Sequence, residues 1–149
     1  MTIETIKRMM DACYQGKRIR DMLPPLQKGV TSSYIQYLDV IQSLERNGIH
    51  VKISDISDAL NLPRPGVTRT IKEMEAGGYL QKKTSQNDGR ITYISITEAG
   101  RTLSQTYDTE YFSALAPSLD IISEEDARQM VQTMETFYQI MCKRRDSHE

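Results

Sequence analysis

The stretch Ile53–Thr97 constrains the fold more than any other part of this chain. Apolar residues at helical spacing over 53–60 are followed by Asn61, a residue type that tolerates a positive φ. Leu62 is then expected to turn inward, and a second helical segment begins around 63–65, which holds two prolines. Proline is tolerated there because the first N–H groups of a helix have no partner within the helix. The stretch therefore predicts two short helices joined by a tight turn.

The second helix has an apolar side and a cationic side. Val67, Ile71 and Met74 recur at a spacing that places them on one buried stripe. The opposite face carries four residues able to contact a ligand: Arg64, Thr68, Arg69 and Lys72. Gly77 and Gly78 end the helix.

Two β segments follow the second helix. Residues 79–84 and 90–96 alternate apolar and polar side chains, and Asp88-Gly89 between them supplies turn chemistry. Residues His50–Lys52 could add a short strand to this hairpin. Arg90 just past the loop would extend from the hairpin tip, where Asp88 orients it or the loop.

Helical patterns flank this stretch on both sides. They are expected at about 3–22, from a cap among Thr31, Ser32 and Ser33 to Asn47, after Thr97, and from Ser123 to the C-terminal basic residues. The fold class is mainly α with a small β-wing, that is, a winged helix-turn-helix between N- and C-terminal helices. The last helix has the clearest apolar series: Ala127, Met130, Val131, Met134, Phe137, Tyr138 and Met141.

Charge is distributed unevenly along the chain. The net charge of all 149 residues is −1. Residues 61–92 nevertheless hold six basic and three acidic residues, whereas residues 93–149 hold five basic and ten acidic ones. A local basic surface on a neutral or acidic body is typical of a selective nucleic-acid reader.

Other classes of protein have little support. Cys13 and Cys142 lie far apart with no paired-cysteine spacing, so neither a disulfide framework nor a zinc site is predicted. We find no Gly-rich phosphate loop, no nucleophile motif and no cofactor motif, and therefore expect no metal, no cofactor and no enzyme. No apolar run is long enough for a membrane span, and the N-terminus lacks a signal peptide. A cytoplasmic protein without membrane contact is expected.

The sequence resembles the multiple antibiotic resistance regulator (MarR) family of transcription factors. Residues 55–62 are similar to its first helix and turn, and Val67-Thr68-Arg69 with Gly78-Tyr79-Leu80 to its second helix and exit. Residues 88–100, which run from Asp88-Gly89-Arg90 to Gly100, match the family wing pattern D-x-R-x-x-x-L-x-L-T-x-x-G. The chain departs from the family at Pro63–Gly66, where small hydroxyl residues are usual.

The resemblance implies a homodimer that reads a palindromic operator in duplex DNA. Residues 1–30 and 98–149 would form the dimerisation region, and residues 31–97 the DNA-binding region, within one intertwined domain. The wing arginine would enter a minor groove, and a small effector or thiol oxidation would release a repressor from DNA. The expected DNA-binding residues are Arg64, Pro65, Gly66, Thr68, Arg69, Lys72, Lys82, Asp88 and Arg90.

Some features allow other readings. Tyr34 and Tyr37, on the apolar face of the helix that ends at Asn47, are candidates for the wall of an effector pocket. Cys13 is similar in position to a sensing cysteine of the family, although a lone cysteine on an apolar helix face is usually core. The Met-rich stripe of the last helix favours a core or dimer interface over a ligand site. The alternative function is a winged-helix protein-interaction module without DNA binding, which would show apolar residues on the outer face of the second helix.

Overall fold

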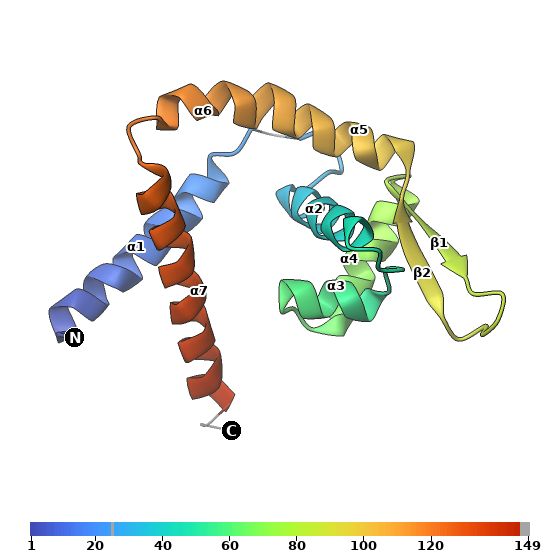
Figure 1. Cartoon of the computed structure of the whole chain (residues 1–149), viewed down its shortest axis with the longest axis horizontal. Coiled ribbons are helices and arrows are strands. Elements are labelled where there is room, and N and C mark those ends of the chain that lie inside the picture. The colour runs from blue at the N-terminus through green and yellow to red at the C-terminus, as the bar shows by residue number, and fades with distance from the viewer. Residues whose placement is uncertain (25, 147–149) are drawn as a thin grey trace. The chain divides into compact units, whose positions relative to one another are not determined.

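The computed structural model describes residues 1–24 and 26–146 (Figure 1). Most helix boundaries lie within a residue or two of those expected from the sequence. In chain order the described elements are α1 (Ile3–Asp21), α2 (Ser32–Arg46), α3 (Ile53–Leu60), α4 (Arg64–Ala76), β1 (Leu80–Thr84), β2 (Thr92–Ile96), α5 (Glu98–Thr106), the π-helix η1 (Tyr107–Phe112), α6 (Ser113–Leu119) and α7 (Glu124–Asp146).

The chain divides into two compact units, and the boundary between them in the sequence lies within η1. The first unit runs from Met1 to Asp108, and the second begins at Thr109. In the first unit, α2 contacts α3 and α5, α3 contacts α4, and the hairpin contacts α2, α4 and α5. The most completely buried side chains come from several of these elements: Leu38, Ile41, Val51, Ile56, Val67, Ile71 and Met74.

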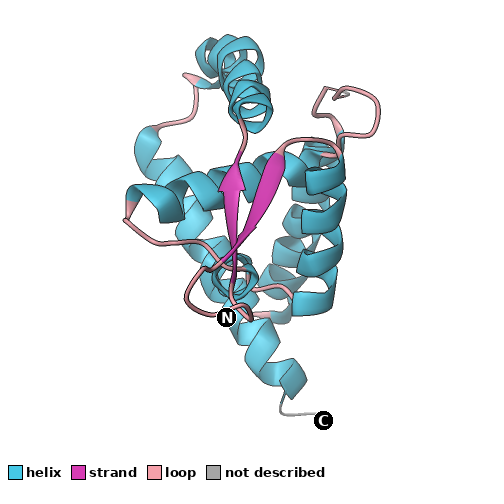
Figure 2. Ribbon diagram, turned by 90° about the vertical axis from the view of Figure 1, so that its right-hand side faces the viewer, coloured by secondary structure: helices cyan, strands magenta, loops and turns pink. Residues whose placement is uncertain are grey.

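Strands β1 and β2 form an antiparallel hairpin (Figure 2). Leu80 pairs with Ile96, and Lys82 with Ile94, so one face of the hairpin carries the buried Leu80, Ile94 and Ile96. The expected short strand at His50–Lys52 is reduced to one backbone bond, in which the Ile94 N–H donates to the Val51 carbonyl at 2.8 Å. Both strands begin later than expected, at Leu80 and Thr92.

The turn between α3 and α4 corrects one expectation. Asn61 has the predicted left-handed conformation, with φ 51°. Leu62, however, is 42% exposed and does not turn inward. Its backbone faces α3 instead: the Leu62 N–H donates to the Ser57 carbonyl at 3.1 Å, and the Ser57 hydroxyl donates to the Leu62 carbonyl at 2.5 Å. Ala59, one of the apolar residues in the helical pattern over 53–60, is exposed as well.

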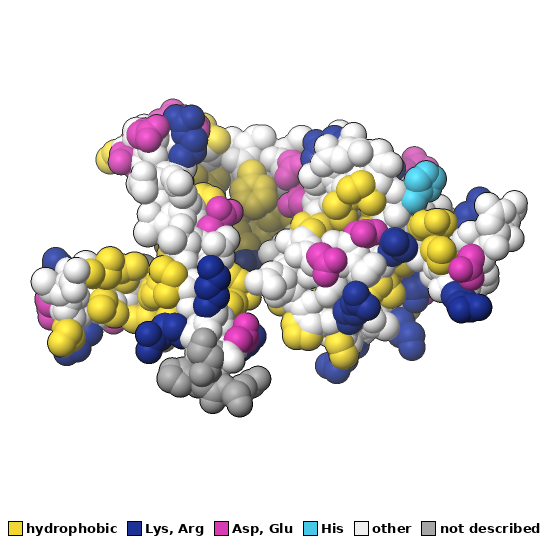
Figure 3. All heavy atoms as spheres, turned by 60° about the horizontal axis from the view of Figure 1, so that its bottom comes forward, with side chains coloured by type: hydrophobic (Ala, Val, Ile, Leu, Met, Phe, Trp, Pro, Cys, Tyr) yellow, Lys and Arg dark blue, Asp and Glu magenta, His cyan; other side chains and the backbone are white. Residues whose placement is uncertain are grey.

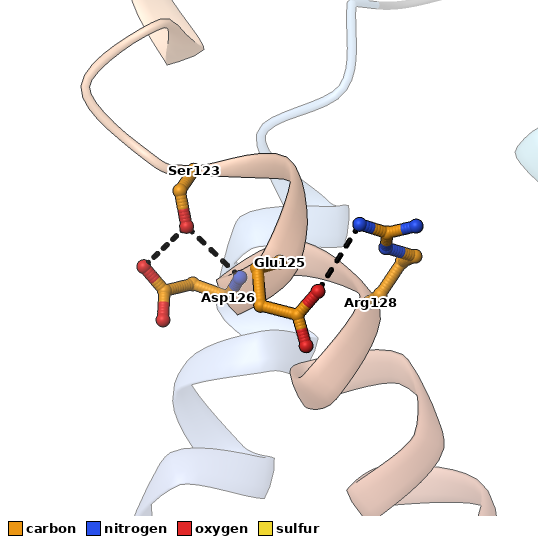
Figure 4. Close-up of polar contacts among 4 residues, drawn as sticks. All are labelled: Ser123, Glu125, Asp126 and Arg128. Atoms are coloured by element: carbon orange, nitrogen blue, oxygen red, sulfur yellow. Dashed lines mark hydrogen bonds and ion pairs between the residues drawn. The ribbon is translucent and has the colours of Figure 1, made fainter.

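In the second unit, the start of α7 is capped as expected. The Ser123 hydroxyl accepts the Asp126 N–H at 3.0 Å and donates to the Asp126 carboxylate at 2.7 Å, while Glu125 pairs with Arg128 (Figure 4). The apolar stripe of α7 is exposed in the single chain: Met130 is 61%, Val131 57%, Met134 40% and Tyr138 51% exposed. Pro117 lies inside α6, which ends two residues later. Within the described residues, no helix combines the length and the apolar character that crossing a membrane requires.

Candidate nucleic-acid interface

Helix α4 presents a cationic face to solvent. Val67, Ile71 and Met74 are fully buried, and they fix the rotation of the helix against the core. Three cations of the predicted site lie on the exposed part of the helix: Arg64, Arg69 and Lys72. Thr68 lies at the edge of this face and is partly buried. Figure 3 shows Lys and Arg side chains gathering on the lower side of the right-hand body.

The first turn of α4 has unusual chemistry. Pro63 is the N-cap, with extended backbone, and Pro65 is the second helical residue, so the cap supplies no side-chain acceptor. Pro65 and Gly66 are both exposed, and the Gly66 carbonyl accepts the Thr70 hydroxyl at 3.2 Å. This turn therefore presents backbone and apolar groups beside the Arg64 guanidinium.

The loop at the tip of the hairpin, residues 85–91, is held by local hydrogen bonds. The Asp88 carboxylate accepts the Arg90 N–H at 3.0 Å, and the Asp88 carbonyl accepts the Ile91 N–H at 3.0 Å. The Ser85 hydroxyl accepts the N–H groups of Asn87 and Asp88. Asp88 thus orients the backbone of the loop, and the exposed Arg90 guanidinium stays free to reach outward.

The cations of this surface differ in their partners. Lys82 forms an ion pair with Glu75 of α4 at 2.9 Å, and its side chain is only 23% exposed. By contrast, Arg64, Arg69, Lys72 and Arg90 form no ion pair within residues 1–24 and 26–146. Four unneutralised cations on α4 and the hairpin tip are an arrangement suited to polyanion binding.

Comparisons with known proteins agree with this geometry. The sequence model described as "MarR family" matches residues 28–91. The chain is 23% identical over 106 residues to the uncharacterised HTH-type transcriptional regulator YdgJ of Bacillus subtilis, a match that covers 71% of this chain and 62% of YdgJ. It is 30% identical over 73 residues to the transcriptional repressor MprA of Escherichia coli K12, covering 49% of this chain and 40% of MprA.

The fold is also that of a protein solved in complex with DNA. Streptococcus pneumoniae FabT, crystallised in complex with DNA, is 19% identical, has a TM-score of 0.66, and aligns over 95% of this chain and 99% of its own. The family model places residues 28–91 of the chain in the MarR family. The winged-helix fold and the family expected from residues 55–100 are therefore confirmed. Because the family consists of transcriptional regulators, the expectation that the protein is no enzyme is confirmed as well.

Two features of the MarR fold join the wing to α4. The Thr97 hydroxyl donates to the Gly78 carbonyl at 2.6 Å and accepts the Gly100 N–H at 3.1 Å. A Cβ at Gly100 would clash with the Tyr79 carbonyl oxygen and lie 2.8 Å from the Ile96 side chain. The Thr97 and Gly100 positions of the wing pattern are thus explained by packing at the base of the wing.

The other sequence-predicted site residues lie away from this surface. Tyr34 and Tyr37 are 5% and 3% exposed in the core, and the Tyr34 ring meets Tyr79 edge-on at 6.2 Å. Burial raises the pKa of Tyr34, and the nearby charges of Glu73 and Tyr79 raise it further, so its hydroxyl stays neutral. Cys13 is a half-buried free thiol on α1. Their roles as pocket wall and redox sensor stay predictions.

Proposed function

We propose that this MarR-family protein is a homodimeric, sequence-specific regulator that binds a palindromic operator in double-stranded DNA and acts as a repressor. The observation that carries the proposal is the set of unpaired, exposed cations on α4 and at the wing tip: Arg64, Arg69, Lys72 and Arg90. Helix α4 would lie in the major groove, where Arg64 and Arg69 reach base edges or phosphates and Lys72 a phosphate. Arg90 would enter the flanking minor groove.

The relatives support this proposal. FabT was crystallised with DNA, and MprA is named a transcriptional repressor. The matched region covers less than two thirds of YdgJ and of MprA. The local site of this chain therefore carries the argument.

The exposed stripe on α7 supports the homodimer. Val131, Met134 and Tyr138 recur at three- and four-residue steps along one face of a 23-residue helix. Apolar side chains at this spacing gain stability when a second helix covers them. A second copy of the chain is the occupant that also gives the two-fold symmetry of a palindrome.

Release from DNA by a small effector or by thiol oxidation completes the proposal. Tyr34 and Tyr37 would form part of the effector pocket, and Cys13 would be the thiol. Mass spectrometry after treatment of the native protein with a thiol reagent tests the second route. Modification of Cys13 without denaturant supports release by thiol oxidation. Complete protection of Cys13 from the reagent argues against it.

Selection of bound sequences from random duplex DNA tests the main proposal. A palindrome with two equal half-sites, about one or two helical turns apart, is the expected result. No enrichment of any sequence, with no binding to duplex DNA at low salt, would favour the alternative of a winged-helix protein-interaction module. The polar, cationic outer face of α4 argues against that alternative.

A further inference from the structure

Gly66 has no role in the fold that requires glycine. It lies inside the first turn of α4, and its φ is not in the left-handed region. A Cβ built at this position meets no atom within 4 Å. Glycine within a helix costs about 1 kcal/mol relative to alanine. Among the described residues, no contact offsets the helix destabilisation that glycine causes at this position.

Gly100 of the same chain shows the opposite situation. A Cβ there would clash with the backbone of Tyr79. Gly78 is likewise required by its backbone, since its φ is 82°. Gly66 differs from both, because the space above its Cα is open to solvent. No described residue accounts for its small size, which directs attention to a partner that approaches from outside.

The neighbours of Gly66 indicate the chemistry of that approach. Leu62 is 42% exposed, and Pro65, which precedes Gly66 in the chain, is exposed as well. Pro63 and Pro65 have no N–H to donate, and no hydroxyl or amide side chain stands between Leu62 and Gly66. Apart from Arg64, this turn can therefore contact a partner only through apolar atoms and backbone. It is a small apolar surface on an otherwise cationic face.

Only one base edge in the major groove offers a matching apolar group, the C5-methyl of thymine. Resting on the proposed DNA-binding function, we infer that Leu62, Pro65 and Gly66 form a seat for one thymine methyl in each half-site. Gly66 provides the space that the methyl enters, and Leu62 and Pro65 provide the apolar walls. This seat reads a base without a hydrogen bond, where the usual family sequence would place hydroxyl groups.

Deoxyuridine scanning of the selected operator tests the seat. Deoxyuridine keeps the base pair of thymine and removes only the methyl. Burial of one methyl group is worth about 0.8 kcal/mol, which corresponds to about a fourfold change in affinity. Replacement of the seated thymine in one half-site should therefore weaken binding about fourfold, and replacement in both half-sites about fifteenfold, while the other thymines should each have a smaller effect. A flat scan, with no sensitive thymine, would overturn the seat.

The variant Gly66→Ala assigns the sensitive thymine to this turn. Its added Cβ fills the space for the methyl, so operator affinity should fall and the difference between thymine and deoxyuridine should disappear. Its thermal stability should stay equal or rise, because alanine favours the helix. Leu62→Ala, which removes a wall instead of filling the space, should also reduce the difference. Unchanged discrimination in both variants would overturn the assignment.

Arg69→Ala separates this inference from the proposed function. It should weaken binding to thymine and deoxyuridine operators alike, so the ratio of the two affinities is kept. If the protein binds its selected operator and Arg69→Ala weakens that binding, but the deoxyuridine scan is flat, the seat alone is wrong. If no duplex binds at all, the proposed function fails and the seat with it.

Discussion

The Thr97 hydroxyl donates a 2.6 Å hydrogen bond to the Gly78 carbonyl, which joins the end of β2 to the exit of α4. The Thr97 N–H donates to the neighbouring Tyr79 carbonyl at 3.1 Å. The same hydroxyl accepts the Gly100 N–H as the cap of α5. One side chain therefore fixes the base of the wing relative to the helix that carries Arg69, and with it the separation of the two proposed DNA contacts.

Thr97→Val should destabilise the fold, because it removes both hydrogen bonds of the hydroxyl while keeping the shape of the side chain. The expected loss is about 1–2 kcal/mol in the free energy of unfolding, as for other helix caps and intramolecular hydrogen bonds. Urea denaturation measures it. Thr102→Val, at an exposed position of α5, is the matched control and should change stability by less than about 0.5 kcal/mol. Equal stability of the two variants would contradict a stabilising role for the two hydrogen bonds of the Thr97 hydroxyl.

Gly100→Ala should also destabilise the protein, for a steric reason. The new Cβ would meet the Tyr79 carbonyl and the Ile96 side chain, and relief of such overpacking costs about 1–3 kcal/mol. Gly16→Ala is the control, since a Cβ at that α1 position meets nothing within 4 Å and should stabilise the helix by up to about 1 kcal/mol. Thermal melts should show a lower melting temperature for Gly100→Ala and an equal or higher one for Gly16→Ala. A Gly100→Ala protein as stable as the wild type would contradict the close approach of Gly100 to the Tyr79 carbonyl.

Glu75→Gln should strengthen binding to DNA. Glu75 holds the Lys82 ammonium at 2.9 Å, and neutralising it frees a cation at the edge of the proposed interface. We expect the dependence of log K on log salt to steepen by about 0.9 per chain, the value for one further phosphate contact. Glu73→Gln removes the same charge from an exposed position of α4 without freeing a lysine. If the two variants have equal salt slopes, Lys82 does not reach a phosphate.

Met134→Glu should convert the proposed dimer into a monomer. It places a charge at the centre of the exposed α7 stripe, where burial against a second copy would leave the carboxylate desolvated. Analytical ultracentrifugation would show the monomer, and operator affinity should fall with the loss of two-site binding. Gln132→Glu adds the same charge at an exposed polar position of the same helix and should remain dimeric. A dimeric Met134→Glu protein would exclude this stripe as the interface.

The sequence was sufficient for those parts of the fold that depend on local pattern. Helix α4 follows from the spacing of Val67, Ile71 and Met74, all fully buried, and the turn before it from Asn61, whose φ is positive. The wing follows from its alternation of residues and from Asp88, whose carboxylate fixes the loop. These features depend on residues close together in the chain.

The features that the sequence did not predict correctly are contacts between residues distant in sequence and contacts made through the backbone. Leu62 was expected inside because it is apolar, but Ser57 binds its backbone and leaves the side chain outside. No pattern in the sequence indicated that Lys82 would pair with Glu75 or that Thr97 would reach Gly78. Both contacts depend on how the hairpin packs against α4, which periodicity does not describe.

The salt dependence of operator binding tests the central claim most directly, namely that α4 and the wing tip bind DNA through Arg69 and Arg90. Fluorescence anisotropy would be measured from low to high salt for the wild-type protein and for the variant with Arg69→Ala and Arg90→Ala. We predict folded protein in both cases and a salt slope shallower by about 1.8 per chain in the double variant, as expected for the loss of two cations that neutralise phosphate charge, with a large fall in affinity. Equal affinity and equal slope for the two proteins would contradict the claim.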